Sequence, residues 1–380
     1  MKISRMLLLA SLLGIVEGCS VTTTTSSYQP PLTTSPLGDA VDIVLNGSGN
    51  ILIAGVTGTS SSQLPAYWEN GSLVTTMPVG PGNFSFTIGW GTVDTSGNFF
   101  VAGATGQTAG SLVPCYWENG ALSYLPVGTG NAAGAALGAA ANGLTIYVAG
   151  GVGASISSLA SCYWTDGAQT LLPAGTGNSY GQGVAVALDT KGNLYFAGDV
   201  GPSGAALLPA SWQGGALTIL PVGPGNSYGL VTGVTVDGTG DVFISGAVGT
   251  SSAALVPCYW ENGTLTVLSM GTGYTIGTAN GVVLDGSGNI LIAGAVGGGA
   301  STLVPCFWKN GALSFLPTGA AGNYGYANGM AVDAGGDLFI IGDVSSASSQ
   351  APCYWKNGIL IPLPQAAITQ SVGGKLVRIR

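Results

Sequence analysis

A tryptophan recurs along this chain at an almost constant interval. Successive members of the series are 49, 47, 48, 48, 48 and 47 residues apart, and a glycine that closes an apolar run recurs in the same phase. The tryptophans are Trp68, Trp117, Trp164, Trp212, Trp260, Trp308 and Trp355, and the glycines are Gly55, Gly103, Gly150, Gly198, Gly246, Gly294 and Gly342. Two independent markers with one period predict seven copies of one structural unit.

Each copy has the pattern of four short strands. From Gly281 to Leu316, apolar runs are separated by the turn sequences Asp-Gly-Ser-Gly-Asn and Lys-Asn-Gly. Asn-Gly between apolar runs favours a tight hairpin, because both turn positions adopt positive φ. With 66 glycines and 19 prolines the chain disfavours long helices. Four antiparallel strands in each unit of about 48 residues predict an all-β fold, a seven-bladed β-propeller over residues 37–380.

The C-terminal end leaves the number of blades open. The stretch from Thr369 to Arg380 aligns with the first hairpin of another unit, so the chain has eight first hairpins and seven second ones. Either this stretch closes the ring by pairing with the first blade, or it forms part of an incomplete eighth blade. We favour seven blades with overlap at the closure.

The N-terminus has the pattern of an export signal. Lys2 and Arg5 precede an apolar run that ends at Val16, which is too short to span a bilayer. Residues 1–18 are therefore predicted to be a signal peptide. The end of this segment resembles the lipobox of bacterial lipoproteins, which implies lipidation of Cys19; the alternative is an ordinary secretory signal. Residues 19–36 would then be the lipid anchor and a flexible tether. By resemblance to lipoproteins of bacteria with two membranes, the lack of Asp at position 20, which holds Ser20, favours the outer membrane over the inner one.

The repeat also resembles a known class. The unit from Gly233 to Gly246, and the Trp-Glu-Asn-Gly or Trp-Lys-Asn-Gly half that follows, resemble bacterial β-propeller repeats of the SBBP type and tandem repeats of exported lipoproteins. The resemblance covers about residues 37–380. It implies the fold and defines no set of catalytic residues.

Composition excludes several functions. Charged residues make up 6% of the chain, histidine is absent, and the net charge is −8. Nucleic-acid binding is excluded because it requires a clustered basic face. The acids that begin one turn in most repeats, Asp94, Asp189, Asp237, Asp285 and Asp333, are interpreted as turn residues rather than calcium ligands, because each turn offers too few carboxylates. We predict no metal and no cofactor.

Five cysteines occupy one repeat position. They are Cys115, Cys162, Cys258, Cys306 and Cys353, and alanine stands there in the other two units. Equivalent positions in neighbouring blades lie farther apart than a disulfide allows, so unpaired buried thiols are predicted. The aromatic pairs are interpreted as packing between blades, with a carbohydrate platform as the alternative.

The segments that link one blade to the next are the predicted ligand-binding surface, because they share one face of a propeller and combine amide with aromatic groups. In the alternative, Gly-Asn makes the turn and the aromatic ring packs over the blade edge. The candidate ligand-binding residues are Asn83, Phe84, Asn178, Tyr180, Asn226, Tyr228, Tyr274, Asn323 and Tyr324.

These observations predict a non-enzymatic binding or scaffold propeller. It would be monomeric, held at a membrane surface through Cys19, and would bind a glycan or a protein. One alternative is a polysaccharide lyase or hydrolase, which would require a non-repeated catalytic group at the channel. Another is a purely structural envelope protein.

Overall fold

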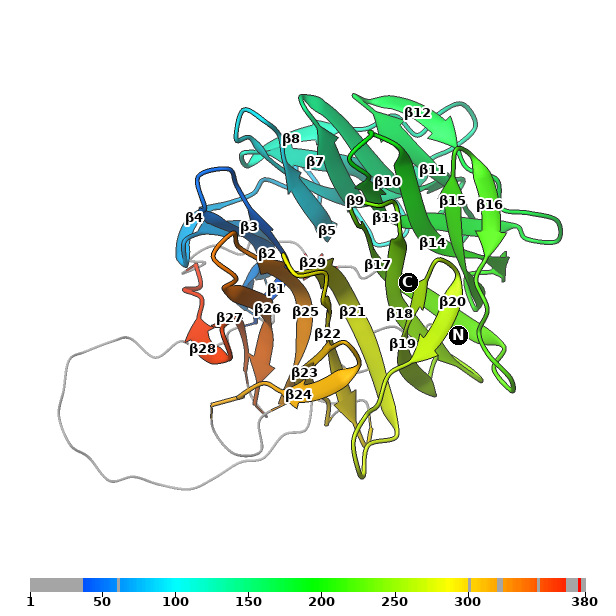
Figure 1. The fold of residues 1–380 in the computed structure, drawn as a ribbon. Coiled ribbons are helices and arrows are strands. Elements are labelled where there is room, and N and C mark those ends of the chain that lie inside the picture. The colour runs from blue at the N-terminus through cyan, green and yellow to red at the C-terminus, as the bar shows by residue number, and fades with distance from the viewer. Residues whose placement is uncertain are drawn as a thin grey trace, which may run out of the picture.

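The computed structural model describes residues 37–59, 62–299, 302–319, 324–346, 349–366 and 375–376. Their strands form seven antiparallel sheets arranged in a ring (Figure 1). The predicted seven-bladed β-propeller is thus confirmed. The signal peptide, Cys19 and the tether lie outside the described residues. None of the described segments forms a helix with the length and hydropathy needed to cross a membrane.

Each blade consists of four strands in chain order. The first, innermost strands are β1 (Asp39–Leu45), β5 (Ser85–Val93), β9 (Ala133–Asn142), β13 (Tyr180–Leu188), β17 (Tyr228–Val236), β21 (Ile276–Leu284) and β25 (Tyr324–Val332). The second strands are β2 (Ile51–Thr59), β6 (Phe99–Gly106), β10 (Thr145–Gly153), β14 (Leu194–Ser203), β18 (Val242–Gly249), β22 (Ile290–Gly297) and β26 (Leu338–Ser345).

The two outer strands of each blade follow the same order. The third strands are β3 (Ser62–Glu69), β7 (Val113–Glu118), β11 (Leu159–Thr165), β15 (Ala206–Gln213), β19 (Leu255–Glu261), β23 (Val304–Lys309) and β27 (Gln350–Lys356). The fourth strands are β4 (Ser72–Thr76), β8 (Ala121–Tyr124), β12 (Ala168–Leu171), β16 (Ala216–Ile219), β20 (Thr264–Val267), β24 (Ala312–Phe315) and β28 (Ile359–Pro362). A short strand, β29 (Lys375–Leu376), follows them.

This strand order gives the ring two different faces. The turns between first and second strands and between third and fourth strands lie at one end of every blade, and we call this end the turn face. The loops between second and third strands and the links from one blade to the next lie at the other end, the loop face. A ligand site on one face is therefore built from a different set of sequence segments than a site on the other.

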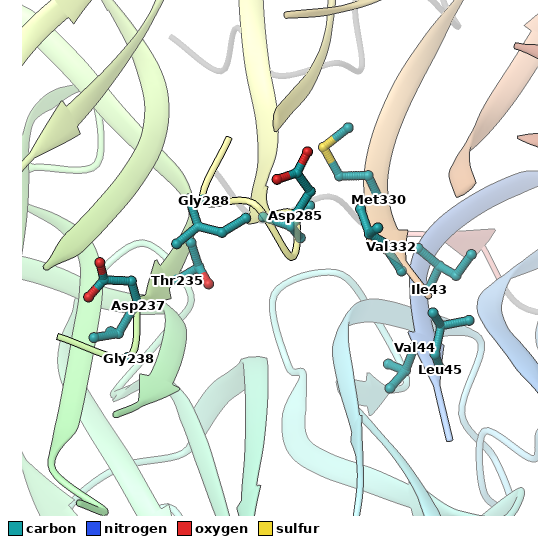
Figure 2. Close-up of a pocket in the computed structure, with 14 residues that line it drawn as sticks. Ile43, Val44, Leu45, Thr235, Asp237, Gly238, Asp285, Gly288, Met330 and Val332 are labelled. Atoms are coloured by element: carbon teal, nitrogen blue, oxygen red, sulfur yellow. The ribbon is translucent and has the colours of Figure 1, made fainter. Parts of the chain in front are cut away.

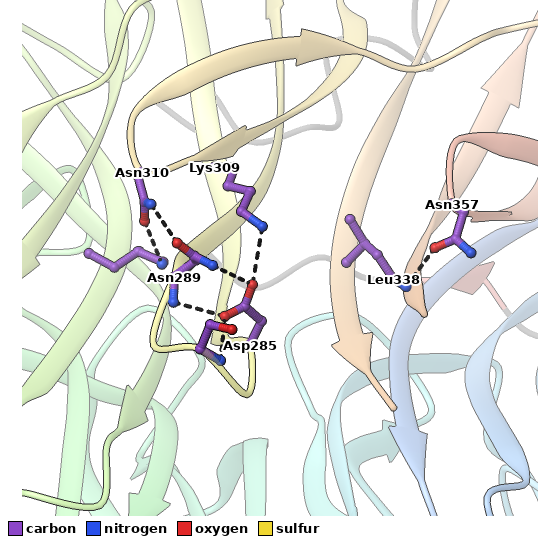
Figure 3. Close-up of polar contacts among 8 residues, drawn as sticks. Asp285, Asn289, Lys309, Asn310, Leu338 and Asn357 are labelled. Atoms are coloured by element: carbon purple, nitrogen blue, oxygen red, sulfur yellow. Dashed lines mark hydrogen bonds and ion pairs between the residues drawn. The ribbon is translucent and has the colours of Figure 1, made fainter. Parts of the chain in front are cut away.

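The two turns of a blade are joined by side chains on the turn face (Figure 3). Asn310 and Gly311 adopt φ of 49° and 82°, as the Asn-Gly signal predicts. The Asn310 Oδ1 accepts a hydrogen bond from the Ile290 backbone nitrogen at 2.9 Å, and its Nδ2 donates to Asn289 Oδ1 at 2.8 Å. Asp285 Oδ1 in turn accepts the Asn289 backbone nitrogen at 2.9 Å. The repeated Asn and Asp therefore hold turns together, as the turn interpretation requires.

The same contact recurs in the seventh blade. Asn357 Oδ1 accepts a hydrogen bond from the Leu338 backbone nitrogen at 2.9 Å (Figure 3). Lysine adds an ion pair in these two blades, with Lys309 Nζ 3.2 Å from Asp285 and Lys356 Nζ 2.8 Å from Asp337. Both pairs are solvent-exposed, so the turn hydrogen bonds contribute more than the ion pairs.

The repeated tryptophan and the repeated glycine meet inside each blade. All seven tryptophans of the series are fully buried. A Cβ atom at Gly246 would lie 2.7 Å from the Trp260 ring and would collide with the Leu230 carbonyl oxygen. Only glycine leaves room for the indole, which explains why the two markers share one period. The tryptophans thus pack between blades and are not a carbohydrate platform.

Each buried indole also fixes the link that enters its blade. Trp117 Nε1 donates to the Pro78 carbonyl at 2.7 Å, and Trp308 Nε1 donates to the Ser269 carbonyl at 2.8 Å. The other members of the series make the same contact. Burial of the large ring is combined with a satisfied donor, as buried tryptophan requires.

The ring closes by the same contact. Trp68 in the first blade donates to the Pro364 carbonyl at 2.7 Å, and the Ala366 nitrogen donates to Thr57 Oγ1 at 2.8 Å. The short strand β29 pairs in parallel with β5 in the second blade. Among the described residues, the C-terminal stretch therefore extends the second blade's sheet and forms no eighth blade.

The cysteines at the shared repeat position are buried and unpaired, as predicted. Burial raises the pKa of the Cys162 thiol to about 12, so the reactive thiolate is scarce at neutral pH. The same cause raises the pKa of the thiols of Cys115 and Cys258.

These thiols should be unreactive in the folded chain. We expect a thiol reagent at pH 8 to modify none of the five in native buffer and all five in denaturant. The sixth cysteine, Cys19, provides an internal control, because five reactive thiols after unfolding indicate a blocked Cys19 and six indicate a free one. Rapid labelling of the five before unfolding would contradict their burial.

Replacing one of the repeated tryptophans by phenylalanine should destabilise the propeller as much at its closure as in another blade. Trp68→Phe removes the donor to Pro364, and Trp212→Phe removes the donor to Pro173 within the chain. We expect each to lower the free energy of unfolding by about 1–3 kcal/mol, because a part-buried hydrogen bond and part of the packing of a buried ring are lost. Chemical denaturation measures this, and an unaffected Trp68 variant would mean that the closure does not depend on the indole.

Candidate functional site

A cavity of about 650 Å³ opens at the mouth of the central channel on the turn face (Figure 2). It is formed by the ends of four inner strands, β1, β17, β21 and β25, together with the turns that follow β17 and β21. Its lining residues are Ile43, Val44, Leu45, Thr235, Val236, Asp237, Gly238, Val283, Leu284, Asp285, Gly288, Met330, Ala331 and Val332. Blades one, five, six and seven thus line the cavity. It therefore lies to one side of the channel axis, although the blades around the ring are repeats of one another.

The walls combine apolar side chains with backbone polar groups. Ile43, Leu45 and Val332 bring aliphatic groups from two inner strands (Figure 2). Each of the four inner strands is the edge strand of its sheet, so no strand pairs with its channel side. An unpaired strand edge presents backbone N–H and C=O groups to whatever lies beside it. The cavity can therefore hold a ligand that has both apolar surface and hydrogen-bonding groups.

Two carboxylates stand at the rim of this cavity, Asp237 and Asp285 (Figure 2). Asp237 Oδ1 accepts hydrogen bonds at 2.8 Å from the backbone nitrogens of Thr239, Gly240 and Asp241. Hydrogen bonds hold the pKa of both carboxyl groups below the usual value, chiefly those from Thr239 and from Asn289, respectively. Both are ionised at neutral pH and are anchored as turn acceptors.

Trp90, on an inner strand of the second blade, reaches the inner strands of two of the blades that line the cavity. The ring comes from β5, where the register shifts between Ile88 and Gly91. Cβ atoms at Gly281 and Gly329 would lie 3.1 and 3.2 Å from this ring, so it spans from the second blade to the sixth and seventh. Gly329 immediately precedes the lining residues of β25, and Gly281 lies two residues before those of β21. Trp90 therefore packs against the inner strands β21 and β25, close to the residues of these strands that line the cavity.

The sequence analysis did not single out Trp90, although a signal exists. The chain has eight tryptophans, and Trp90 is the one outside the repeat series. The equivalent inner-strand positions hold Gly233, Gly281 and Gly329. A bulky residue in a column of glycines marks a departure from symmetry, and such departures indicate a site.

Asp42 occupies the equivalent position in the first blade and joins this blade to the second. Its Oδ2 accepts a hydrogen bond from the Gly91 backbone nitrogen at 2.5 Å. The carboxyl group is fully buried, and this burial raises its pKa to about 7. Asp42 is thus a buried acid that is close to half protonated at neutral pH, packed beside the strand that carries Trp90.

Similar contacts join other neighbouring blades around the channel. In β17, β21 and β25 a polar residue at a β-bulge reaches a backbone carbonyl of the next inner strand, each at 2.8 Å. The contacts are Thr232 Oγ1 to the Ala279 carbonyl, Asn280 Nδ2 to the Ala327 carbonyl, and Asn328 Nδ2 to the Ala40 carbonyl. Bulges often redirect a side chain in this way. These polar residues therefore hold blades together, which was not foreseen from the sequence.

On the loop face, the predicted asparagines close their own turns. Asn83, Asn178 and Asn226 donate through Nδ2 to a backbone carbonyl four residues earlier, at 2.8, 2.7 and 2.8 Å. These contacts match the alternative in which Gly-Asn makes the turn. Asn323 lies outside the described residues.

The predicted aromatic residues are not gathered into one site. Tyr180 and Tyr228 are 4% and 7% exposed and belong to one core cluster, so their rings are not part of the loop surface. Tyr274 packs on Phe315 with ring centroids 5.6 Å apart, and the Tyr324 hydroxyl donates to the Ser346 carbonyl at 3.1 Å. Phe84, at 56% exposed, presents its ring to solvent.

No group of three or more His, Cys, Asp or Glu side chains with the spacing of a metal site occurs in the described part of the chain. The buried acids Asp39, Asp42, Asp199 and Asp343 lie in the inner two strands of their blades, and the other acids of the described residues, including the buried Asp94, lie on the turn face.

The fold is similar to known propeller structures at low sequence identity. A polysaccharide lyase of family PL25, an ulvan lyase bound to -[GlcA(1-4)Rha3S]-, matches with a TM-score of 0.54 at 12% identity over 84% of this chain and 94% of that one. A puromycin-hydrolyzing peptidase of Mycobacterium tuberculosis matches with 0.50 at 10% identity, over 88% of this chain and 54% of that one. A fucose lectin from Kordia zhangzhouensis matches with 0.27 at 16% identity, over 36% and 98%. The matches to the lyase and the peptidase support the propeller fold alone.

No protein-family model matches the chain, and no curated protein sequence matches it. The site must therefore be interpreted from its own geometry.

The buried Asp42 should make stability depend on pH. The pKa of Asp42 is about 7 in the folded protein and 3.8 in the unfolded chain. The folded state tolerates only the protonated carboxyl group well, so stability is lost as the pH rises from about 4 to 7 and the group ionises. Asp42→Asn does not titrate. We expect the variant to gain about 2–3 kcal/mol of unfolding free energy relative to the wild type between pH 5 and pH 8. Denaturant titrations at both pH values measure this, with Asp237→Asn as an exposed control, and a constant difference would contradict the raised pKa.

Proposed function

We propose that this protein is a non-enzymatic binding propeller that is anchored in the cell envelope and takes its ligand at the turn-face mouth of the channel. The observation that carries the proposal is the eccentric cavity of about 650 Å³, two of whose lining strands contact the non-repeated Trp90. A repeat scaffold gives seven equivalent surfaces, whereas this cavity is formed by four of the blades and so distinguishes one ligand position from its repeats.

The chemistry at the cavity favours binding over catalysis. The rim carboxylates Asp237 and Asp285 have lowered pKa values and are tied into their turns, so they are poor proton acceptors at neutral pH. Lys309, the cation paired with Asp285, is exposed on the third strand of its blade. These groups can accept hydrogen bonds from a ligand, which is a binding role.

Charge restricts the ligand class. The cavity opens on the face that carries the acidic turns, so a polyanionic ligand would be repelled. Hydroxyl groups suit ionised carboxylates and free backbone edges, and the apolar walls suit the C–H faces of a sugar ring. We therefore favour an uncharged or amine-bearing glycan. An extended protein segment is the second candidate, because the same strand edges can pair with a peptide backbone.

The membrane anchor in this proposal is the lipid on Cys19. The motif at Gly18-Cys19 and the uncharged stretch that follows support it. The lipidated protein would reside in the envelope, with the outer membrane as the favoured location.

Blocking the cavity should abolish ligand binding. A Cβ atom at Gly238 meets nothing within 4 Å, and the backbone there is not left-handed, so Gly238→Trp should fold while filling the mouth. Thr190→Trp places the same ring at the equivalent turn of the fourth blade, which does not line the cavity. On a glycan array with the full chain in detergent, we expect wild type and Thr190→Trp to bind the same glycans and Gly238→Trp to lose at least tenfold in signal.

Two outcomes would count against the proposal. Binding that survives Gly238→Trp would move the site away from the cavity. Absence of glycan binding by the wild type would reject the glycan and leave the protein segment, which the same three proteins would test in a peptide-library screen.

A further inference from the structure

The exposed charges of this propeller are confined to one face. Among the described residues, every acidic side chain outside the two inner strands of a blade lies at the turn-face end of its blade. Every lysine whose side chain the structure describes lies at this end too. They are Glu69, Asp94, Glu118, Asp166, Asp189, Asp237, Asp241, Glu261, Asp285, Asp333 and Asp337, with Lys191, Lys309 and Lys356. The turn face is therefore strongly negative.

The described connecting segments of the loop face, apart from the C-terminal strand with Lys375, carry no such charges. They contain Gly, Ser, Thr, Asn, Gln, Ala, Pro and apolar residues, and none contains Asp, Glu, Lys or Arg. The described segments are residues 77–84, 125–132, 172–179, 220–227, 268–275 and 316–319 between blades, and residues 107–112, 154–158, 204–205, 250–254, 298–299, 302–303, 346 and 349 within them.

Exposed apolar side chains gather around the edge of this uncharged face. Five of them end the fourth strands of blades two to six, where each strand reaches the loop face: Tyr124, Leu171, Ile219, Val267 and Phe315, between 43% and 61% exposed. Phe84 lies in the link to the second blade and is 56% exposed. We call these six residues the apolar rim. A ring of exposed apolar groups around an uncharged face is unusual on a freely soluble surface and marks an interaction site.

The chain enters the propeller on this same face. The Leu37 nitrogen donates to the Gly58 carbonyl at 2.9 Å, and Leu37 bridges to Gln350, at the loop-face end of the seventh blade. Residues 1–36 therefore connect to the fold from the loop face. The C-terminal strand β29 also pairs there, with Lys375 opposite Ser85 at the start of β5.

We propose that the loop face lies against the lipid bilayer surface, with the apolar rim in the headgroup region and the acidic turn face directed away. This proposal rests on the anchor at Cys19 in the proposed function. From Cys19 to Leu37 the chain can extend at most about 60 Å, which keeps the propeller close to the membrane. This orientation would place the cavity, which opens on the turn face, on the side away from the membrane, where ligands approach.

Charge and hydrophobicity favour this orientation over its reverse. An anionic lipid surface repels the carboxylates of the turn face within about one Debye length, roughly 8 Å at physiological salt. The loop face carries no such penalty, and aromatic and aliphatic side chains are stabilised at the lipid interface. The two faces therefore differ both in charge and in exposed apolar side chains, the two properties that determine which face lies against a membrane.

Lipid-attached quenchers can determine the orientation. The full lipidated chain would be placed on vesicles of phosphatidylethanolamine and phosphatidylglycerol that contain a headgroup-nitroxide lipid. A fluorophore would be attached at Thr176→Cys on the loop face or at Ser287→Cys on the turn face, both of which are exposed positions. The native cysteines of the propeller are buried and will not be labelled. We expect at least threefold stronger quenching at position 176 than at position 287.

A matched pair of variants tests the apolar rim. Leu171→Glu, Ile219→Glu and Val267→Glu together should remove the difference in quenching. Leu144→Glu with Ile359→Glu should preserve it, because these exposed apolar side chains, at 67% and 69%, lie at turn-face ends. Circular dichroism melts check that each variant is folded.

The outcomes separate this proposal from the anchor. Equal quenching at the two positions, or stronger quenching at position 287, on vesicles that retain the protein overturns the orientation alone. Failure of the chain to float with the vesicles overturns the anchor and the orientation together. Loss of the difference in the Leu144 and Ile359 control would show that the apolar rim is not its cause.

Discussion

The contact on which this structure depends is the indole that lies over a glycine and donates to the link entering its blade. Trp260 illustrates it, since its ring occupies the space that a side chain at Gly246 would need, and its nitrogen binds the Pro221 carbonyl at 2.8 Å. The contact joins packing within a blade to the connection between blades. The same contact joins Trp68 to the C-terminal Pro364, and the C-terminal strand β29 adds to the sheet of the second blade, so the chain ends are tied together at the closure.

Function in such a ring must come from departures from the repeat. The inner strands provide them: Trp90 and Asp42 occupy positions where other blades have glycine or alanine, and polar bulge residues replace aliphatic ones in blades five to seven. Trp90 packs against β21 and β25, and the turns of blades five and six shape the cavity that these strands line. The asymmetric side of the ring is thus the side on which a ligand position is defined.

Most of the candidate residues predicted on the loop face serve the fold. The signal that selected them, Gly-Asn with an aromatic neighbour, is also the signal of a closed turn, and side-chain hydrogen bonds four residues back account for Asn83, Asn178 and Asn226. Burial of Tyr180 and Tyr228 could not be foreseen, because a tyrosine at the start of a strand has the same sequence pattern whether its ring turns inward or outward. The cavity was missed because its residues come from four distant repeats.

The sequence by itself determined the fold class, the seven repeats, the Asn-Gly turns and the buried unpaired cysteines, because each follows from contacts within one period that is repeated seven times. The tertiary structure decided which departures from the period meet. Trp90 contacts Gly281 and Gly329 only because the ring closes, and the charged and uncharged segments separate into two faces only because antiparallel strands return to the same end. Local patterns specify a blade, whereas a site and a polarised surface require the geometry of all seven.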